Sequence, residues 1–156
     1  MIKIKVPGGK LLRLDHLVLD YNGTLAVDGK ILKDIKPKLK KLQEVLTIHV
    51  ITADTFGKVL DNLKGIPCKT LILKGTGQQA QKAEYIKKLG AGKTVAIGNG
   101  LNDAMMLKQA ALGMAVIQEE GASAKTLMNA DLVFQSITGA LDVLINDKRL
   151  IASLRN

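Results

Sequence analysis

The chain has 156 residues, of which 47% are hydrophobic, and it carries a formal net charge of +9. This length and composition suit one globular domain with a buried core and exclude an acidic disordered protein. No apolar run approaches the roughly 18 residues that span a bilayer, and the amino terminus lacks the apolar core of a signal peptide. We therefore expect a soluble, cytoplasmic protein without a membrane partner, and the single Cys68 excludes an internal disulfide.

In chain order, the first half of the sequence alternates short apolar runs with helical patterns. Hairpins are predicted where Pro7-Gly8-Gly9 and Asp28-Gly29 supply the turns. The expected elements are a hairpin over 2–14, a buried strand over 16–20, a small hairpin over 25–32, a helix over 36–46, a strand over 47–54, a helix over 55–64 and a strand over 68–74.

The second half continues the same alternation. The expected elements are a helix over 77–90, a strand over 93–100, a helix over 102–110, a strand over 112–117, a helix over 121–130, a short strand over 131–134 and helix over 137–155, broken near Asn146-Asp147. Strands that are rich in Val, Ile and Leu and separated by helices predict a parallel sheet covered on both faces. The fold class is therefore α/β, a three-layer Rossmann-like arrangement in a single domain over 1–156.

Polar residues follow the predicted strands at their carboxyl ends. Asp20 ends the strand over 16–20, Thr52 lies at the end of the strand over 47–54, and Asp103 follows the strand over 93–100. In a parallel sheet such residues meet at one edge, near a switch in strand order. With Lys82 from the preceding helix, this set could perform phosphoryl transfer: the Asp attacks phosphorus, hydroxyl and backbone N–H groups hold phosphate oxygens, and the Lys neutralises charge.

Four segments in this order resemble the haloacid dehalogenase (HAD) superfamily of phosphatases and phosphotransferases. The segments are DYNGTL (20–25), the VITAD segment that contains Thr52, the helix that carries Lys82, and GNGLND (98–103). GNGLNDAMMLKQAALGMAV and the following ASAKTLMNADLVF are most similar to the phosphorylation domain of P-type ATPases. The pairing of DYNGTL with GNGLND looks like the soluble P-type ATPase-like proteins.

The resemblance implies a role for each matching catalytic or phosphate-binding position. Asp20 would form an aspartyl-phosphate, Thr52 would hydrogen-bond the phosphoryl oxygens, and Lys82 would contact both Asp20 and phosphate. Gly23 would permit a sharp turn that Thr24 supports. The implied phosphate-binding set is Gly23, Thr24, Thr52, Ala53, Lys82 and Asn102.

The resemblance also implies a Mg²⁺ cofactor. Its ligands would be Asp20, the backbone carbonyl of Asn22, Asn99 in place of a usual Asp, and Asp103 either directly or through its neighbours. Oxygen donors of this kind suit Mg²⁺, although each Asp replaced by Asn removes a negative charge and should weaken binding.

Asn22 and Asn99 depart from the phosphatase pattern, and two hypotheses about the function remain open. Asn22 stands where phosphatases hold a general acid/base Asp, a group that contributes roughly 10²–10⁴-fold to each proton transfer. The first hypothesis is a slow HAD-type enzyme that is limited to activated phosphates. The second is a HAD fold kept for phosphate or metal binding and regulation, with little catalysis.

The short stretch between Asp20 and Thr52 leaves no room for a cap or a nucleotide-binding domain. The hairpin over 25–32 is then the available lid, and a homo-oligomer, dimer or tetramer, in which a neighbour covers the site is plausible for such an enzyme. The expected partner is a small phosphorylated substrate.

Nucleic-acid binding is the weakest interpretation. Lys and Arg together number 23 against 14 acidic residues, which could attract a polyanion. The lysines are spread along helix faces, however, and aromatic residues make up only 3% of the chain, so no stacking platform for single strands is expected.

Overall fold

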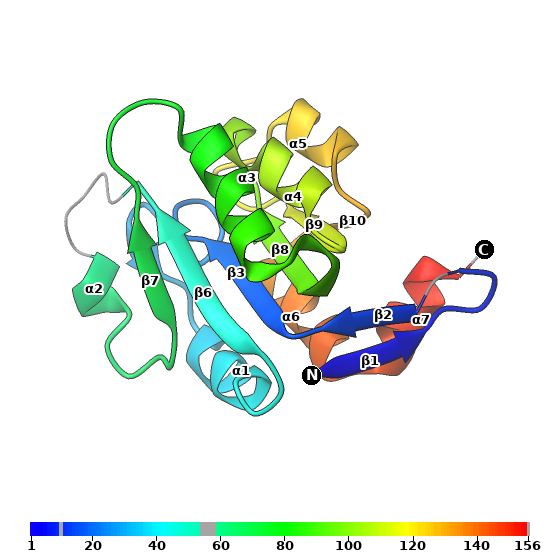
Figure 1. Ribbon diagram of the computed structural model, residues 1–156. Helices are drawn as coiled ribbons and strands as arrows, with labels where there is room; N and C mark the ends of the chain where they lie inside the picture. The colour runs from blue at the N-terminus through cyan, green and yellow to red at the C-terminus, as the bar shows by residue number, and fades with distance from the viewer. Residues whose placement is uncertain (10, 54–58, 156) are drawn as a thin grey trace.

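A six-stranded parallel sheet forms the centre of the computed structural model, which describes residues 1–9, 11–53 and 59–155 (Figure 1). Its strands lie in the order β10-β9-β8-β3-β6-β7, and every neighbouring pair is parallel. The bounds are β3 (His16–Asp20), β6 (Thr47–Thr52), β7 (Lys69–Ile72), β8 (Thr94–Gly98), β9 (Leu112–Val116) and β10 (Leu132–Phe134). The predicted α/β class is confirmed.

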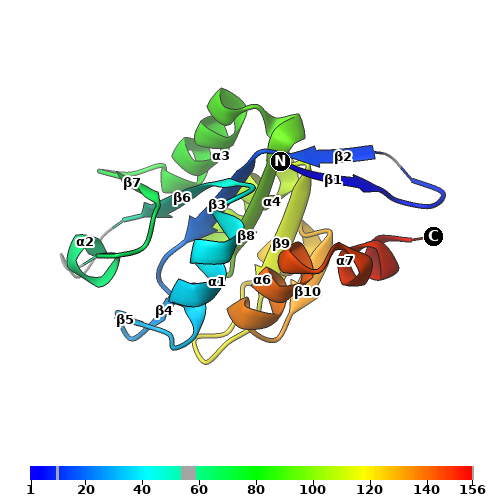
Figure 2. The ribbon, with the colours of Figure 1, turned by 90° about the horizontal axis from the view of Figure 1, so that it is seen from below.

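Helices cover both faces of the sheet and complete the three predicted layers (Figure 2). One face carries α3 (Gln78–Leu89), α4 (Ala104–Gln109) and α5 (Ala124–Met128), whereas α1 (Ile35–Leu42) and α6 (Ile137–Ile145) cover the other. The remaining helical pieces are α2 (Val59–Asn62), α7 (Asp147–Leu154) and the 3₁₀ turns η1 (Ala91–Lys93) and η2 (Leu101–Asp103). None of the helices in the described ranges is long and apolar enough to cross a membrane.

Both predicted hairpins are present as antiparallel pairs outside the main sheet. The first pairs β1 (Ile2–Lys5) with β2 (Leu11–Leu14), and the second pairs β4 (Ala26–Val27) with β5 (Lys30–Ile31). Only this second hairpin and α1 lie between β3 and β6, so no large cap stands beside the carboxyl end of β3. The predicted break between α6 and α7 falls at Asn146.

Several predicted element ends differ from the structure. The helix predicted over 36–46 ends at Leu42, because the chain must turn there so that the Thr47 N–H can donate to the Asp15 carbonyl (2.8 Å) at the start of β3. The strand predicted over 93–100 ends at Gly98, because the next two N–H groups bond a side chain of η2 instead of a neighbouring strand. Part of the helix predicted over 55–64 lies outside the described residues, and α2 is its described portion.

Alternation along β3 decides where the site lies. Leu17 and Leu19 pack into the core cluster that includes α1 and α6, whereas Val18 packs into the cluster beneath α3 and α4. Successive side chains of a strand point to opposite faces. Asp20 therefore shares the face of Val18 and points toward the side of the sheet that α3 covers.

The two histidines form a chain of polar contacts with Tyr85. His16 Nδ1 lies 3.2 Å from His49 Nε2, and His49 Nδ1 lies 2.8 Å from the Tyr85 hydroxyl. His49 is buried between β6 and α3, and burial together with the nearby His16 lowers the pKa of His49 to about 4. Between about pH 4 and pH 6.5, the folded protein therefore keeps this imidazole neutral, whereas the unfolded chain would protonate it.

We predict that this histidine makes the fold acid-sensitive. Because the pKa of His49 is lower in the folded state than the ordinary 6.5, its stability contribution is complete above pH 6.5 and is lost as the pH falls toward 4. The full loss corresponds to about 3 kcal/mol. Urea unfolding of wild type and His49→Gln from pH 7 to pH 4 should show a steeper loss in wild type, and parallel curves would contradict the prediction.

Candidate active site

The candidate site lies where the strand order switches direction. From β3 the chain adds β6 and then β7 on one side, and it returns to place β8 on the other side of β3. Loops that leave the carboxyl ends of β3 and β8 therefore diverge, and such a switch point is where open α/β sheets bind ligands. Asp20 ends β3 and Asp103 ends the η2 turn after β8, so both residues belong to this edge.

A buried lysine joins the two carboxylates. Lys82 of α3 places its Nζ 2.5 Å from Asp20 Oδ1 and 2.7 Å from Asp103 Oδ1. Lys82 and Asp103 are fully buried and Asp20 is 6% exposed. The sequence prediction that Lys82 reaches Asp20 agrees with this contact, and the additional bond to Asp103 was not foreseen.

The charges gathered at this site shift the pKa values of Asp20 and Lys82. Burial and the nearby Asp103 raise the pKa of Asp20 to about 7, although the Lys82 ammonium opposes the rise. Burial would lower the pKa of Lys82, but the charges of Asp20 and Asp103 outweigh it and raise that pKa above its ordinary value. With all three groups ionised, two carboxylates share one ammonium and a net negative charge remains, which favours a cation at this position.

Asp103 is fixed on both of its oxygens. Oδ1 accepts from Lys82, and Oδ2 accepts from the backbone N–H groups of Asn99 (3.0 Å) and Gly100 (2.9 Å). A Cβ on Gly98 would lie 2.5 Å from Asp103 Cγ, so this close approach requires glycine. Asp103 therefore orients Lys82 and the β8 loop through contacts that leave it little capacity for a further ligand.

Asn99 connects the β8 loop to the loop after β3. Its Oδ1 accepts from the Thr24 hydroxyl (3.3 Å), and its Nδ2 donates to the Gly121 carbonyl (3.0 Å). Gly23 adopts a φ of +74°, and a Cβ there would lie 2.2 Å from Asn99 Nδ2. The predicted need for glycine at position 23 thus has two causes, the backbone conformation and the amide packed against it.

Asn22 carries an unsatisfied oxygen. Its Oδ1 is buried and has no hydrogen-bond partner among the described residues. An orphaned buried acceptor costs free energy unless a ligand satisfies it, and an amide oxygen is a donor that Mg²⁺ accepts. Asp20 and Asn22 therefore fit a hard cation. The described part of the chain contains no group of three or more His, Cys, Asp or Glu residues that could hold a metal ion.

The other predicted residues lie on adjoining elements. Thr52 is buried at the end of β6, next to β3 in the sheet, and the half-buried Ala53 follows it. Asn102 lies in η2, and its Nδ2 is 3.5 Å from Gln78 Oε1 at the start of α3. Sequence reasoning missed Gln118, which donates to the carbonyls of Gly23 and Thr24 at 2.9 Å each. No local motif marks a glutamine that bonds distant backbone atoms.

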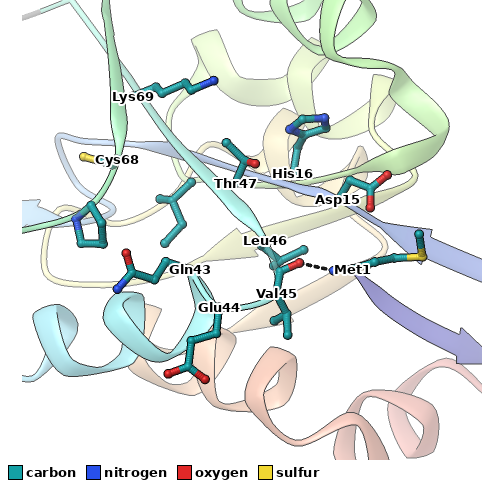
Figure 3. Close-up of a pocket in the computed structure, with 12 residues that line it drawn as sticks. Met1, Asp15, His16, Gln43, Glu44, Val45, Leu46, Thr47, Cys68 and Lys69 are labelled. Carbon is teal, nitrogen blue, oxygen red and sulfur yellow. Dashed lines mark hydrogen bonds between the residues drawn. The ribbon is translucent and has the colours of Figure 1, made fainter.

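A cavity of about 780 Å³ lies away from this site, at the amino ends of β3, β6 and β7 (Figure 3). Its lining includes His16, Thr47, Lys69 and the half-buried Cys68, and the Met1 amine donates to the Val45 carbonyl at its wall. None of the predicted site residues lines it. This cavity therefore does not serve the carboxyl-end chemistry.

No family model matches the chain. The chain is 50% identical over 64 residues to the uncharacterized protein MJ0073 of Methanocaldococcus jannaschii, a match that covers 41% of this chain and 69% of that protein. It is 46% identical over 39 residues to MJ0072 of the same organism, which covers 25% of this chain and 89% of that protein. The chain belongs to one family with these two archaeal proteins.

Solved structures identify the fold. A structure described as a HAD superfamily (subfamily III A) hydrolase from Legionella pneumophila aligns with a TM-score of 0.72 at 18% identity, covering 90% of this chain and 87% of that chain. The protein has the HAD fold. A sequence identity of 18% supports a shared fold. The likeness to P-type ATPases is an interpretation of the sequence motifs.

Two further structures with the HAD fold are sugar-phosphate phosphatases. The 3-deoxy-D-manno-octulosonate 8-phosphate phosphatase from Moraxella catarrhalis, in complex with magnesium, phosphate and KDO, aligns with a TM-score of 0.67 at 18% identity, covering 90% of this chain and 92% of that chain. A cobalt-bound deoxy-D-mannose-octulosonate 8-phosphate phosphatase (YrbI) from Haemophilus influenzae aligns with a TM-score of 0.70 at 15% identity, covering 91% of this chain and 90% of that chain.

We predict that Gly23→Ala disrupts the site more than its backbone alone explains. A left-handed backbone costs a residue with a side chain about 1–2 kcal/mol, and here the methyl group would also displace the Asn99 amide. Gly65→Ala is the matched control, because Gly65 has a φ of +78° with no atom within 4 Å of its Cβ position. Urea unfolding should show a larger loss for Gly23→Ala, and equal losses would show that the contact with Asn99 is unimportant.

Proposed function

We propose that the protein is a Mg²⁺-dependent phosphohydrolase or phosphotransferase that acts through a phosphoryl group on Asp20. The observation that supports this most directly is the buried Lys82 ammonium bonded to Asp20 and Asp103 at the switch point of a HAD fold. Burying a charged lysine costs free energy, and buried lysines are typical of sites where negative charge must be neutralised. Two solved structures that share this fold are named phosphatases, which supports this chemistry.

The chain's own groups supply the steps of transfer. An Asp20 carboxylate oxygen attacks phosphorus, and the bond from phosphorus to the leaving oxygen breaks with its electron pair remaining on that oxygen. Lys82 holds Asp20 in position through Oδ1 and neutralises part of the charge of the incoming phosphate. Thr52 and Ala53, at the end of β6, are proposed to bind phosphoryl oxygens through the hydroxyl and the backbone N–H.

Release of the phosphate from Asp20 requires water to attack phosphorus while the carboxylate leaves. Asn22 cannot accept the proton from that water, nor can it protonate the first leaving group. The leaving group must therefore depart as an anion, which restricts substrates to activated phosphates such as acyl phosphates, aryl phosphates or phosphoanhydrides. Slow hydrolysis would give an acceptor other than water time to take the phosphoryl group.

Mg²⁺, when bound, would neutralise negative charge between the protein carboxylates and the phosphate. We assign its protein ligands to Asp20 and Asn22, with Asn99 beside them. Asp103 already accepts three hydrogen bonds, so it is better suited to orienting its neighbours than to direct coordination. The pKa of Asp20, raised to about 7 by burial and by Asp103, implies that protons compete with the cation near neutral pH.

A second function, phosphate or metal binding without turnover, is favoured by one observation. Asn99, which stands where the superfamily usually has a metal-binding Asp, is tied to Thr24 and Gly121 by both ends of its amide. These bonds give the residue a structural role in which a charge is unnecessary. In either case the β4–β5 hairpin is the lid that the chain provides, and we propose that a second copy of the chain covers the site.

Turnover of an aryl phosphate with Mg²⁺ tests the proposed function. Asp20→Ala removes the nucleophile and should lower the rate at least about a thousandfold, since groups that act covalently contribute on this scale. Asp61→Ala is the matched control, because that carboxylate is largely exposed on α2 and should leave the rate unchanged. Equal rates in wild type and Asp20→Ala would rule out the aspartyl-phosphate mechanism.

Asn22→Asp tests whether the missing acid/base limits turnover at this site. A carboxylate at this position would restore proton transfer and should raise steady-state turnover by about 10²-fold or more. Asn146→Asp, an exposed change between α6 and α7, controls for the added charge. A folded Asn22→Asp protein that binds Mg²⁺ but remains no faster than wild type would show that the missing acid/base does not limit this site.

A further inference from the structure

The segment between β9 and α5 contacts three parts of the candidate site, although no sequence motif marks it. Gln118 bonds the loop after β3, and Glu120 Oε1 accepts from the Asp28 N–H of the β4–β5 hairpin (3.0 Å). Gly121 and Ser123 bond Asn99, the first through its carbonyl and the second through its N–H (2.9 Å). The segment therefore backs the site from outside its reacting groups.

Gln118 makes the most complete set of these contacts. Its Nε2 donates to the carbonyls of Gly23 and Thr24 at 2.9 Å each, and its Oε1 accepts from the Ile137 N–H at 2.9 Å. The two donors and the acceptor of the amide face groups of the opposite kind, so the amide has one favourable orientation. Because Ile137 is buried at the start of α6, the glutamine ties the loop to a fixed part of the core.

A bond within the loop fixes the peptide plane that follows Asn22, and Gln118 fixes the two planes after it. The Gly23 N–H donates to the Ala26 carbonyl (2.7 Å), and in a trans peptide the preceding carbonyl points the opposite way, so the Asn22 carbonyl is turned away from Ala26. Gln118 then holds the next two carbonyls on its own side of the loop. Thr24 of the same loop also donates its hydroxyl to Asn99 Oδ1.

We propose that Gln118 is a positioning residue that holds the Asn22–Thr24 loop in the shape that binds the cation. The proposal rests on the proposed function, because that function supplies the Mg²⁺ ligand role of Asn22. Gln118 does not contact the reacting groups itself and acts through the two carbonyls. Groups that orient metal ligands in this way typically change metal affinity 10–100-fold when they are mutated.

Titration with Mg²⁺ alone, followed by calorimetry, tests the proposal in the full chain. Gln118→Leu keeps the approximate size of the side chain but removes all three hydrogen bonds, and it should weaken Mg²⁺ binding about tenfold or more. Gln81→Leu is the matched control, because Gln81 Nε2 likewise donates to two loop carbonyls, those of Lys74 (3.2 Å) and Thr76 (2.9 Å). Gln81→Leu should lose similar stability while keeping wild-type Mg²⁺ affinity.

The outcomes separate this proposal from the proposed function. Wild-type affinity in folded Gln118→Leu, or an equal loss in Gln81→Leu, overturns the positioning role. Absence of Mg²⁺ binding in wild type overturns it together with the cofactor assignment. If Mg²⁺ affinity follows Gln118 while Asp20→Ala turns over an aryl phosphate as fast as wild type, the proposed function fails and the positioning role stands.

Nuclear magnetic resonance of the wild-type protein provides a second measurement that does not depend on a variant folding. The side-chain NH₂ group of Gln118 should exchange slowly with solvent, because both hydrogens are bonded to carbonyls. Its signals should shift during a Mg²⁺ titration with the same midpoint as the backbone amide of Gly23. A Gly23 signal that moves while the Gln118 NH₂ signals stay unchanged would contradict the coupling between them.

Discussion

The ammonium of Lys82, buried between Asp20 and Asp103, is the interaction on which the site depends. It brings together β3, α3 and the turn after β8, which are distant in the sequence. Removing one partner from such a buried pair typically costs about 3–5 kcal/mol, because an uncompensated charge remains. The parallel sheet makes this contact possible, since the strand order β8-β3-β6 places the two carboxylates at one edge and α3 over the same face.

Two asparagines give the site a lower charge than the phosphatase pattern would. Asn99 is integrated into the structure by bonds to Thr24 and Gly121, and it packs against Gly23. Asn22 differs, because its buried Oδ1 lacks a partner among the residues described. The two replacements are therefore unlike in physical terms. Asn99 serves the architecture of the loops, whereas Asn22 leaves a buried acceptor without a partner among the described residues and has no carboxyl group to transfer a proton.

Much of the fold follows from local patterns that the sequence displays. Buried strands rich in Val, Ile and Leu, glycine turns and the break at Asn146 are local signals, and the structure contains each of them. The early end of α1 was missed because it depends on a bond from Thr47 to Asp15, a contact between distant residues. The family resemblance selected Lys82 and Asp103, but their direct bond, like the role of Gln118, depends on tertiary geometry.

The central claim is that Asp20 carries a phosphoryl group during the reaction. Intact-protein mass spectrometry after acid quenching, with an acyl or aryl phosphate and Mg²⁺, measures this directly. The account predicts that wild-type protein gains the mass of one phosphoryl group, located on the peptide that contains Asp20, and that Asp20→Ala gains none. A phosphoryl group on another residue, or turnover by wild type without any covalent adduct under conditions where Asn22 slows its release, would contradict the account.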